Sequence, residues 1–186
     1  DGVSGMELIA ALADLCKEKS RPVIAIDGPA GAGKTTLAQE LFRAFSTKSS
    51  VQVIHMDDLY DGWTNPLSTQ LSTRIVNQIL TPYIDGMPTK YKKYNWLLEK
   101  FDEEVYVPPT KYLILEGVGS GQKALRHLVD ISIWIEFNPQ LGFERVIKRD
   151  GEMIRNQMLD FLIVQDEHFS QEKTSNFAHC TLNGAP

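Results

Sequence analysis

The sequence has few cysteines and histidines, and this excludes several classes of site. Its 186 residues include two cysteines, Cys16 and Cys180, which stand far apart with no C-x-x-C or Cys/His spacing. A disulfide framework or a zinc site needs more of these residues at closer spacing. The four histidines show no metal-ligand spacing either. We therefore expect two ordinary buried thiols, and histidines that pack or lie on the surface.

Long apolar runs and an excess of positive charge are also missing. No apolar stretch approaches the ~20 residues of a membrane span, and the first residues lack the layout of a signal peptide. The formal net charge is −5, from 19 Lys and Arg against 24 Asp and Glu, so no global field attracts nucleic acid or anionic lipid. The length is that of one ordinary domain. We expect a single cytoplasmic domain over residues 1–186, without nucleic-acid or membrane partners.

Short apolar runs alternate with helical patterns along the chain. Strands buried on both faces are predicted at residues 23–26, 51–54, 112–115 and 131–135, with a weaker fifth at 179–182. Helical spacing recurs in residues 35–45, 68–80, 122–128, 141–148 and 153–169, and an opening helix through residues 6–15 has Ser4 as a candidate N-cap. Such alternation predicts a three-layer α/β/α fold with a mostly parallel, five-stranded sheet. Residues 81–109, rich in proline, tyrosine and charge, are predicted to be an insertion between sheet strands.

A glycine-rich segment directly follows the first predicted strand. Residues 28–35 read GPAGAGKT and match the P-loop pattern G-x-x-x-x-G-K-[ST] at every required position. Its backbone N–H groups can surround a phosphate, and the following helix N-terminus adds a favourable dipole. We expect Lys34 to reach the β- and γ-phosphates and Thr35 to bind Mg²⁺. The residues predicted to bind the nucleotide are Gly28, Ala30, Gly31, Ala32, Gly33, Lys34, Thr35 and Thr36.

Acidic residues follow the next two predicted strands. Asp57 and Asp58 end the second, and Glu116 ends the third. The carboxyl ends of parallel strands lie on the same edge as the P-loop. A carboxylate there can accept a proton from an acceptor hydroxyl and help to hold Mg²⁺ through water, which suits phosphoryl transfer to an alcohol. The same residues could instead cap the next helix or turn.

Basic residues gather further along, around Asp150 and Gly151. Arg145, Arg149 and Arg155 come at the end of one predicted helix and the start of the next. Arginines on a mobile segment can close over the charge that develops in phosphoryl transfer. We therefore predict a lid at about residues 145–160, with a solvated helix face as the alternative.

Together these motifs resemble the P-loop nucleoside kinases of the uridine kinase and phosphoribulokinase group, over residues 23–182. The resemblance implies an ATP-dependent kinase that moves the γ-phosphate to a hydroxyl of a small molecule, with a nucleoside as the first candidate. It makes Asp57 the expected catalytic base and Asp58 the reserve. The other implied roles are catalysis for Lys34, Arg149 and Arg155, a nucleotide contact for Arg145, and Mg²⁺ binding for Thr35, Asp57 and Glu116.

The acceptor side departs from that family. Uridine kinases carry a Tyr-Asp-Phe element followed shortly by a histidine, whereas this chain has Tyr94-Asn95-Trp96 and no histidine after it. Tyr94 and Trp96 could still stack on a base. The predicted acceptor-binding residues are Asp58, Tyr60, Tyr94 and Trp96.

Other functions stay open from the sequence. The entry to the P-loop, residues 24–31, also resembles that of cytidylate kinases, whose acceptor is a nucleoside monophosphate. Such an acceptor needs arginines, and the stretch after Asp57 offers only Arg74 before its lysines. A nucleotide-binding ATPase or switch without a small-molecule acceptor is a third reading. Pantothenate and sugar phosphates also remain open as hydroxyl acceptors.

Overall fold

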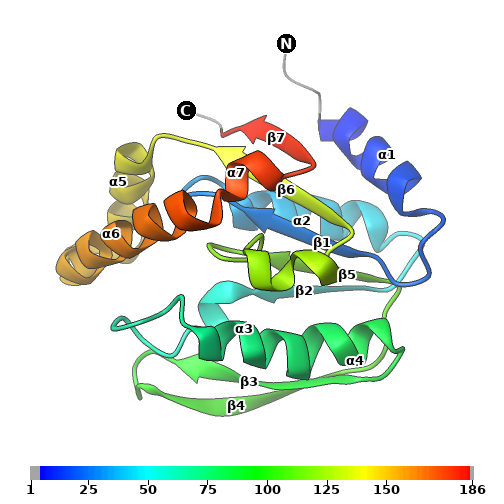
Figure 1. Cartoon of the computed structure of the whole chain (residues 1–186), viewed down its shortest axis with the longest axis horizontal. Helices are drawn as coiled ribbons and strands as arrows, with labels where there is room; N and C mark the ends of the chain where they lie inside the picture. The colour runs from blue at the N-terminus through cyan, green and yellow to red at the C-terminus, as the bar shows by residue number, and fades with distance from the viewer. Residues whose placement is uncertain (1–4, 185–186) are drawn as a thin grey trace.

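Five parallel strands form the centre of the molecule in the computed structural model, which describes residues 5–184 (Figure 1). The strand order is β2-β5-β1-β6-β7, and every neighbouring pair is parallel. The strands are β1 (Val23–Asp27), β2 (Val51–His55), β5 (Tyr112–Glu116), β6 (Ile131–Glu136) and β7 (Cys180–Asn183). All five predicted strands, including the weakest, are confirmed.

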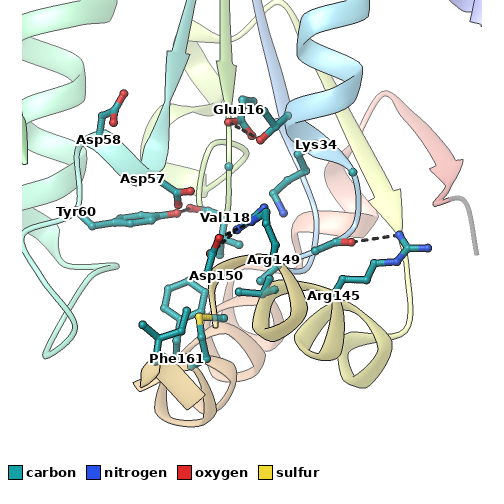
Figure 2. A pocket seen from close by; sticks show the side chains of 18 of the residues that line it. Lys34, Asp57, Asp58, Tyr60, Glu116, Val118, Arg145, Arg149, Asp150 and Phe161 are labelled. Atoms are coloured by element: carbon teal, nitrogen blue, oxygen red, sulfur yellow. Dashed lines mark hydrogen bonds and ion pairs between the residues drawn. The ribbon is translucent and has the colours of Figure 1, made fainter. Parts of the chain in front are cut away.

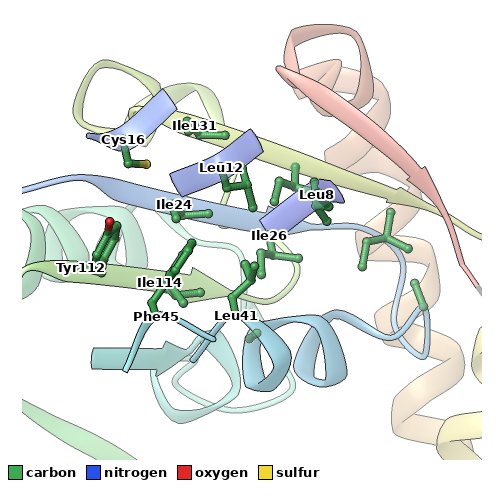
Figure 3. Close-up of a cluster of buried hydrophobic side chains, with 14 of the residues drawn as sticks. Leu8, Leu12, Cys16, Ile24, Ile26, Leu41, Phe45, Tyr112, Ile114 and Ile131 are labelled. Atoms are coloured by element: carbon green, nitrogen blue, oxygen red, sulfur yellow. The ribbon is translucent and has the colours of Figure 1, made fainter. Parts of the chain in front are cut away.

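Helices cover both faces of this sheet, because alternate residues of the central strands point to opposite sides. Ile24 and Ile114 pack under α1 (Gly5–Cys16) and α2 (Lys34–Phe45), in the cluster of Figure 3. Val23 and Leu113 face α3 (Thr69–Ile75), η2 (Val76–Leu80) and α4 (Thr81–Ile84). The predicted three-layer arrangement is therefore confirmed. Cys16 is buried in the first cluster, whereas Cys180 is only half-buried on β7.

Most predicted helices are present, with differences at their ends and in type. The helix expected at 68–80 starts at Thr69, where the Ser68 hydroxyl accepts the Leu71 N–H at 3.3 Å, and it continues through the π-helical η2 into α4. Residues 123–128 form η3 (Lys123–Leu128), so the helical segment expected there is present as a 3₁₀ helix. Six residues are too few to support an α-helix on their own, and 3₁₀ bonds are usual in such short pieces. The candidate cap Ser4 lies outside the described residues.

The segment predicted to be an insertion holds α4 and a separate antiparallel hairpin. Its strands are β3 (Thr89–Asn95) and β4 (Lys100–Val107). The hairpin lies outside α3 and α4 (Figure 1) and buries Tyr91 with the residues of that helical layer. Thr89 also donates a hydrogen bond to Gln52 of β2 at 3.0 Å. The base of the hairpin, where Thr89 pairs with Val107, is therefore held at a defined place beside the sheet.

The carboxyl ends of the central strands bring the sequence motifs together. β1 ends directly before the P-loop, β5 ends at Glu116, and β2 leads into the short helix η1 (Met56–Asp58). Beside this edge stand α5 (Pro139–Asp150) and α6 (Arg155–Glu172), joined by η4 (Glu152–Ile154) and followed by α7 (Thr174–Phe177). Within residues 5–184, no helix has the length and apolar character that crossing a membrane would require.

Candidate active site

The P-loop lies directly against helix α5, and glycines make this close approach possible. Gly31 has a φ of 78°, and a Cβ built there would lie 2.2 Å from the backbone oxygen of Gly142. A Cβ on Gly142 would lie 2.1 Å from the backbone oxygen of Ala30. The Ala30 N–H donates to the buried side chain of Gln165 on α6 at 2.8 Å. Helices α5 and α6 are thus fixed against the loop that would hold phosphates.

Lys34 begins α2 and is buried, with 8% of its surface exposed. Its ammonium donates to the carbonyl of Pro29 across the loop at 2.6 Å. Burial lowers the pKa of Lys34, while the nearby carboxylates of Asp27, Glu116 and Asp57 oppose that shift. The ammonium is therefore enclosed by the P-loop and lies near the acids at the strand ends.

Glu116 receives two hydrogen bonds at the end of β5. The Thr35 hydroxyl donates to Glu116 Oε1 at 3.1 Å, and His55 Nδ1 lies 2.5 Å from the same oxygen. His55 and Glu116 are paired neighbours on the parallel strands β2 and β5. The hydrogen bond to Glu116 raises the pKa of His55. Sequence reasoning assigned the histidines no role in the site; the available signal was the place of His55 at a strand end, two residues before Asp57.

Asp57 and Asp58 both line the pocket shown in Figure 2, but their surroundings differ. Asp57 faces the open pocket. Enclosure by the pocket walls and the charge of Glu116 raise its pKa, while Lys34 opposes the rise. Asp58 lies 4.0 Å from the ammonium of Lys93 on the hairpin. Of the two carboxylates, Asp57 is therefore the one that lies near Lys34 and Glu116, whereas Asp58 lies near Lys93.

The three arginines of the predicted lid have different surroundings. Arg149 lines the pocket and grips the carboxylate of Asp150 through two hydrogen bonds, of 2.7 and 2.8 Å. Arg145 also lines it, donates to the backbone oxygen of Gly31 at 3.4 Å, and stacks over Phe137.

Arg155 is not among the pocket-lining residues. It forms ion pairs with Glu152 at 2.6 Å and with Glu144 at 3.7 Å. Between the two helices, Gly151 has a φ of 102°, which residues with a side chain rarely adopt. No atom lies within 4 Å of the place that a Cβ would occupy. The segment thus changes direction at a residue suited to it.

The half of the pocket beyond Asp57 is aromatic and apolar. The whole pocket has a volume of about 710 Å³. Trp63 and Trp96 stand 5.0 Å apart between ring centroids, and Trp63 also meets the edge of Phe161. The Tyr60 hydroxyl donates to the backbone oxygen of Val118 at 2.5 Å, which fixes one wall. The Trp96 indole N–H donates to the backbone oxygen of Asp57 at 3.0 Å, so the hairpin contacts η1 directly.

Several expected residues lie outside the pocket, and several unexpected ones lie in it. Tyr94 stands behind Trp96, with edge contacts to Trp96 and Phe101, and neither Tyr94, Gly28 nor Ala32 is among the lining residues. The pocket is also lined by apolar residues that the sequence analysis did not propose for the site: Val118, Val146, Ile154, Met158 and Phe161. Their spacing in the sequence is that of ordinary core residues, so only the fold brings them here.

The oxygen atoms at this edge suit a hard cation. Thr35 and Glu116 are hydrogen-bonded together, and Asp57 lies close enough to interact electrostatically with Glu116. Within residues 5–184, no group of three or more His, Cys, Asp or Glu side chains is arranged to hold a metal ion by itself. Mg²⁺ usually keeps waters and phosphate oxygens and takes only one or two carboxylates from the protein. The residues present therefore fit Mg²⁺ delivered with a nucleotide.

A P-loop between a buried strand and a helix, with acids at the neighbouring strand ends, is the arrangement of the P-loop nucleotide-binding proteins. A family model, the NB-ARC domain, matches residues 6–79, fewer than half of the chain and including its P-loop. The uridine kinase of Bacillus subtilis (strain 168) is 30% identical over 161 residues, which cover 79% of this chain and 75% of that enzyme. The chain therefore belongs to the uridine kinase family.

Solved structures agree with this fold. A possible uridine kinase from Bacillus stearothermophilus superposes with a TM-score of 0.68 at 19% identity, covering 95% of this chain and 98% of that one. A D-glycerate 3-kinase from Cryptococcus neoformans superposes with a TM-score of 0.59 at 13% identity, covering 92% and 88%. The shared scaffold thus serves kinases with different names, and the acceptor must be argued from this chain's own pocket.

Proposed function

We propose that this protein transfers the γ-phosphate of Mg²⁺-bound ATP to a hydroxyl of a neutral small molecule, with a nucleoside as the first candidate. The observation that carries the proposal is a single pocket with two unlike halves. One half holds Lys34, Thr35 and Glu116, and the other is walled by aromatic side chains. Asp57 lies between the two halves.

The proposed chemistry follows from these positions. The P-loop N–H groups and Lys34 bind the phosphates, and bound Mg²⁺ would neutralise charge on their oxygens beside Thr35, Asp57 and Glu116. Asp57 orients the acceptor hydroxyl and takes its proton as the hydroxyl oxygen attacks the γ-phosphorus. The bond from that phosphorus to the ADP oxygen breaks, and ADP leaves.

The lid arginines take different parts in this proposal. Arg149 would exchange its pairing with Asp150 for the transferring phosphoryl group. Arg145 would contact the nucleotide beside Gly31. Arg155 is held by Glu152 and Glu144, so it would reach the phosphates only if the segment around Gly151 moved.

The acceptor half supports a neutral compound over a phosphorylated one. Its walls include the rings of Tyr60, Trp63, Trp96 and Phe161, and aromatic walls favour a flat ring. Two basic residues on this side of the molecule are already engaged: Lys93 lies beside Asp58, and Arg74 donates to the backbone oxygen of Leu59 at 2.6 Å. A monophosphate acceptor would bring two negative charges towards Asp57 and Asp58 without an arginine assigned to them.

The test is coupled ADP release with Mg²⁺ and ATP against a panel of nucleosides, nucleoside monophosphates, pantothenate and sugar phosphates. Lys34→Ala serves as the blank. We expect turnover that depends on nucleosides and is absent from the blank. A rate that no acceptor raises would overturn the proposal, and stimulation by monophosphates alone would replace it with the cytidylate-like activity.

A further inference from the structure

His55 lies at the edge of the candidate active site, although the spacing of the histidines in the sequence gave it no role there. It is the last residue of β2 and lies directly beside Glu116 in the register of the parallel pair β2–β5. The two residues therefore share one face of the sheet edge, at the mouth of the P-loop. The His55 side chain keeps 38% of its surface exposed, whereas the Glu116 side chain keeps 5%. The imidazole is therefore not part of the core, and its contact with the almost buried carboxylate can hold that carboxylate in one orientation.

The two hydrogen bonds of Glu116 meet on one oxygen. His55 Nδ1 and the Thr35 hydroxyl both reach Oε1, at 2.5 and 3.1 Å. Nδ1 donates this hydrogen bond in the forms of the imidazole that carry a proton on Nδ1. The donors come from two elements, β2 and α2. Two donors fixed on separate elements restrict rotation of the carboxylate and turn its second oxygen, Oε2, away from them.

We infer that His55 is a positioning residue that orients Glu116 for the Mg²⁺ of the bound nucleotide. The inference rests on the proposed function of the same site. Partners that hold a metal-binding group in place commonly change metal affinity or activity by about 10–100-fold when they are removed. His55 itself does not touch the nucleotide or the acceptor in this account. It acts through Glu116 alone.

A structural role for His55 makes a different prediction from a positioning role. If the imidazole only packs against β5, then its loss would weaken nucleotide binding equally with and without Mg²⁺. If it orients Glu116, then its loss would remove affinity only where Mg²⁺ contributes. The ratio of the two affinities separates these cases without any measurement of turnover.

The experiment measures binding of the non-hydrolysable ATP analogue AMP-PNP by calorimetry, once with excess Mg²⁺ and once with EDTA. The proteins are the wild type, His55→Ala, His55→Leu, His55→Asn and the control His127→Ala. Asn offers an amide N–H near the place of Nδ1, while Leu fills the space of the ring without a donor. Leu also provides a second donor-free variant if Ala disturbs folding. His127 lies in η3, away from the pocket-lining residues.

We expect Mg²⁺ to strengthen binding about 10-fold less in His55→Ala and His55→Leu than in the wild type, with affinity in EDTA unchanged. We expect His55→Asn to recover most of the effect and His127→Ala to match the wild type. An unchanged Mg²⁺ effect in the donor-free variants would overturn the inference, as would equal losses with and without Mg²⁺ or a failure of Asn to rescue. Wild-type acceptor turnover, assayed in parallel, tests the proposed function separately.

Discussion

At the scale of single residues, the chemistry depends on which carboxylate at the end of β2 meets the acceptor. Asp57 faces the pocket beside Lys34 and Glu116, and the pocket walls raise its pKa. Asp58 is drawn towards Lys93 on the hairpin. The sequence alone could not decide which of the two is the better candidate for the base, because both follow the same strand. Their neighbours in the fold favour Asp57.

The first prediction compares these two residues. Asp57→Asn should lower turnover by about 10²-fold or more, since a single well-placed charged group commonly contributes this much. Asp58→Asn should mainly raise the KM for the acceptor. Saturation kinetics for ATP and for the acceptor, on both variants, check this. Near wild-type turnover in Asp57→Asn would show that the base has been assigned to the wrong residue.

A second residue, Asp27, makes stability depend on pH. Its fully buried carboxylate accepts the N–H groups of Gly28, Gly119 and Gly121, yet burial raises its pKa from 3.8 to about 6. The folded state therefore holds this proton more tightly than the unfolded state does. The stability gained from it is present below about pH 4 and is lost as the pH rises through about 6.

Denaturant unfolding of the wild type and Asp27→Asn at pH 4.5 and pH 7 tests this second prediction. The wild type should lose more stability than the variant between these pH values, by an amount on the order of 2 kcal/mol. In Asp27→Asn, the side-chain amide can face a backbone N–H group and lower the free energy of unfolding. This loss is the same at both pH values, so it cancels when the changes between pH 4.5 and pH 7 are compared. Parallel pH dependence in the two proteins would contradict the raised pKa.

At the scale of elements, the P-loop contacts α5, the helix that leads into the predicted lid. Gly31 and Gly142 permit this contact, since a Cβ on either would approach a backbone oxygen. The P-loop pattern predicts the first glycine but says nothing of the second. Gly142 lies in the interior of α5, where glycine is a weak helix former. The close packing is the physical reason for its presence.

The third prediction follows from this packing. Gly142→Ala should raise the KM for ATP and lower the free energy of unfolding by about 1–2 kcal/mol, since overpacking here exceeds the gain in helix propensity. Thermal unfolding and ATP kinetics are the measurements. Gly5→Ala, at the start of α1, where nothing lies within 4 Å of the new Cβ, is the matched control: it should leave the ATP kinetics unchanged and should not lower the free energy of unfolding. A stabilised Gly142→Ala protein with wild-type ATP kinetics would contradict the role of this contact.

The β3–β4 hairpin is the second element that shapes the site. Trp96 reaches from it to the backbone oxygen of Asp57 and to the ring of Trp63. As the fourth prediction, Trp96→Phe should keep the aromatic wall but lose the hydrogen bond, and so raise the KM for the acceptor several-fold with the KM for ATP unchanged. Leu97→Ala, 91% exposed on the same tip, should have no effect. Equal changes in both KM values would show that the hairpin acts on the whole site instead.

At the scale of the whole molecule, the sequence predicted what local patterns determine. Buried parallel strands appear as short apolar runs, and the P-loop and the acids at strand ends follow those runs directly. The wall formed by Val118, Met158 and Phe161 could not be predicted, because these residues look like any core position until α6 packs against the turn that follows β5. His55 was missed for the same reason, since its contact with Glu116 comes from the pairing of β2 with β5.

The most direct measurement follows the label of γ-³²P-ATP in the presence of the acceptor that most strongly stimulates ADP release. We expect the label to appear in the phosphorylated acceptor, in step with ADP, and Lys34→Ala to transfer none. Label found only as inorganic phosphate, at a rate unaffected by the acceptor, would contradict the account and indicate a nucleotide-hydrolysing switch.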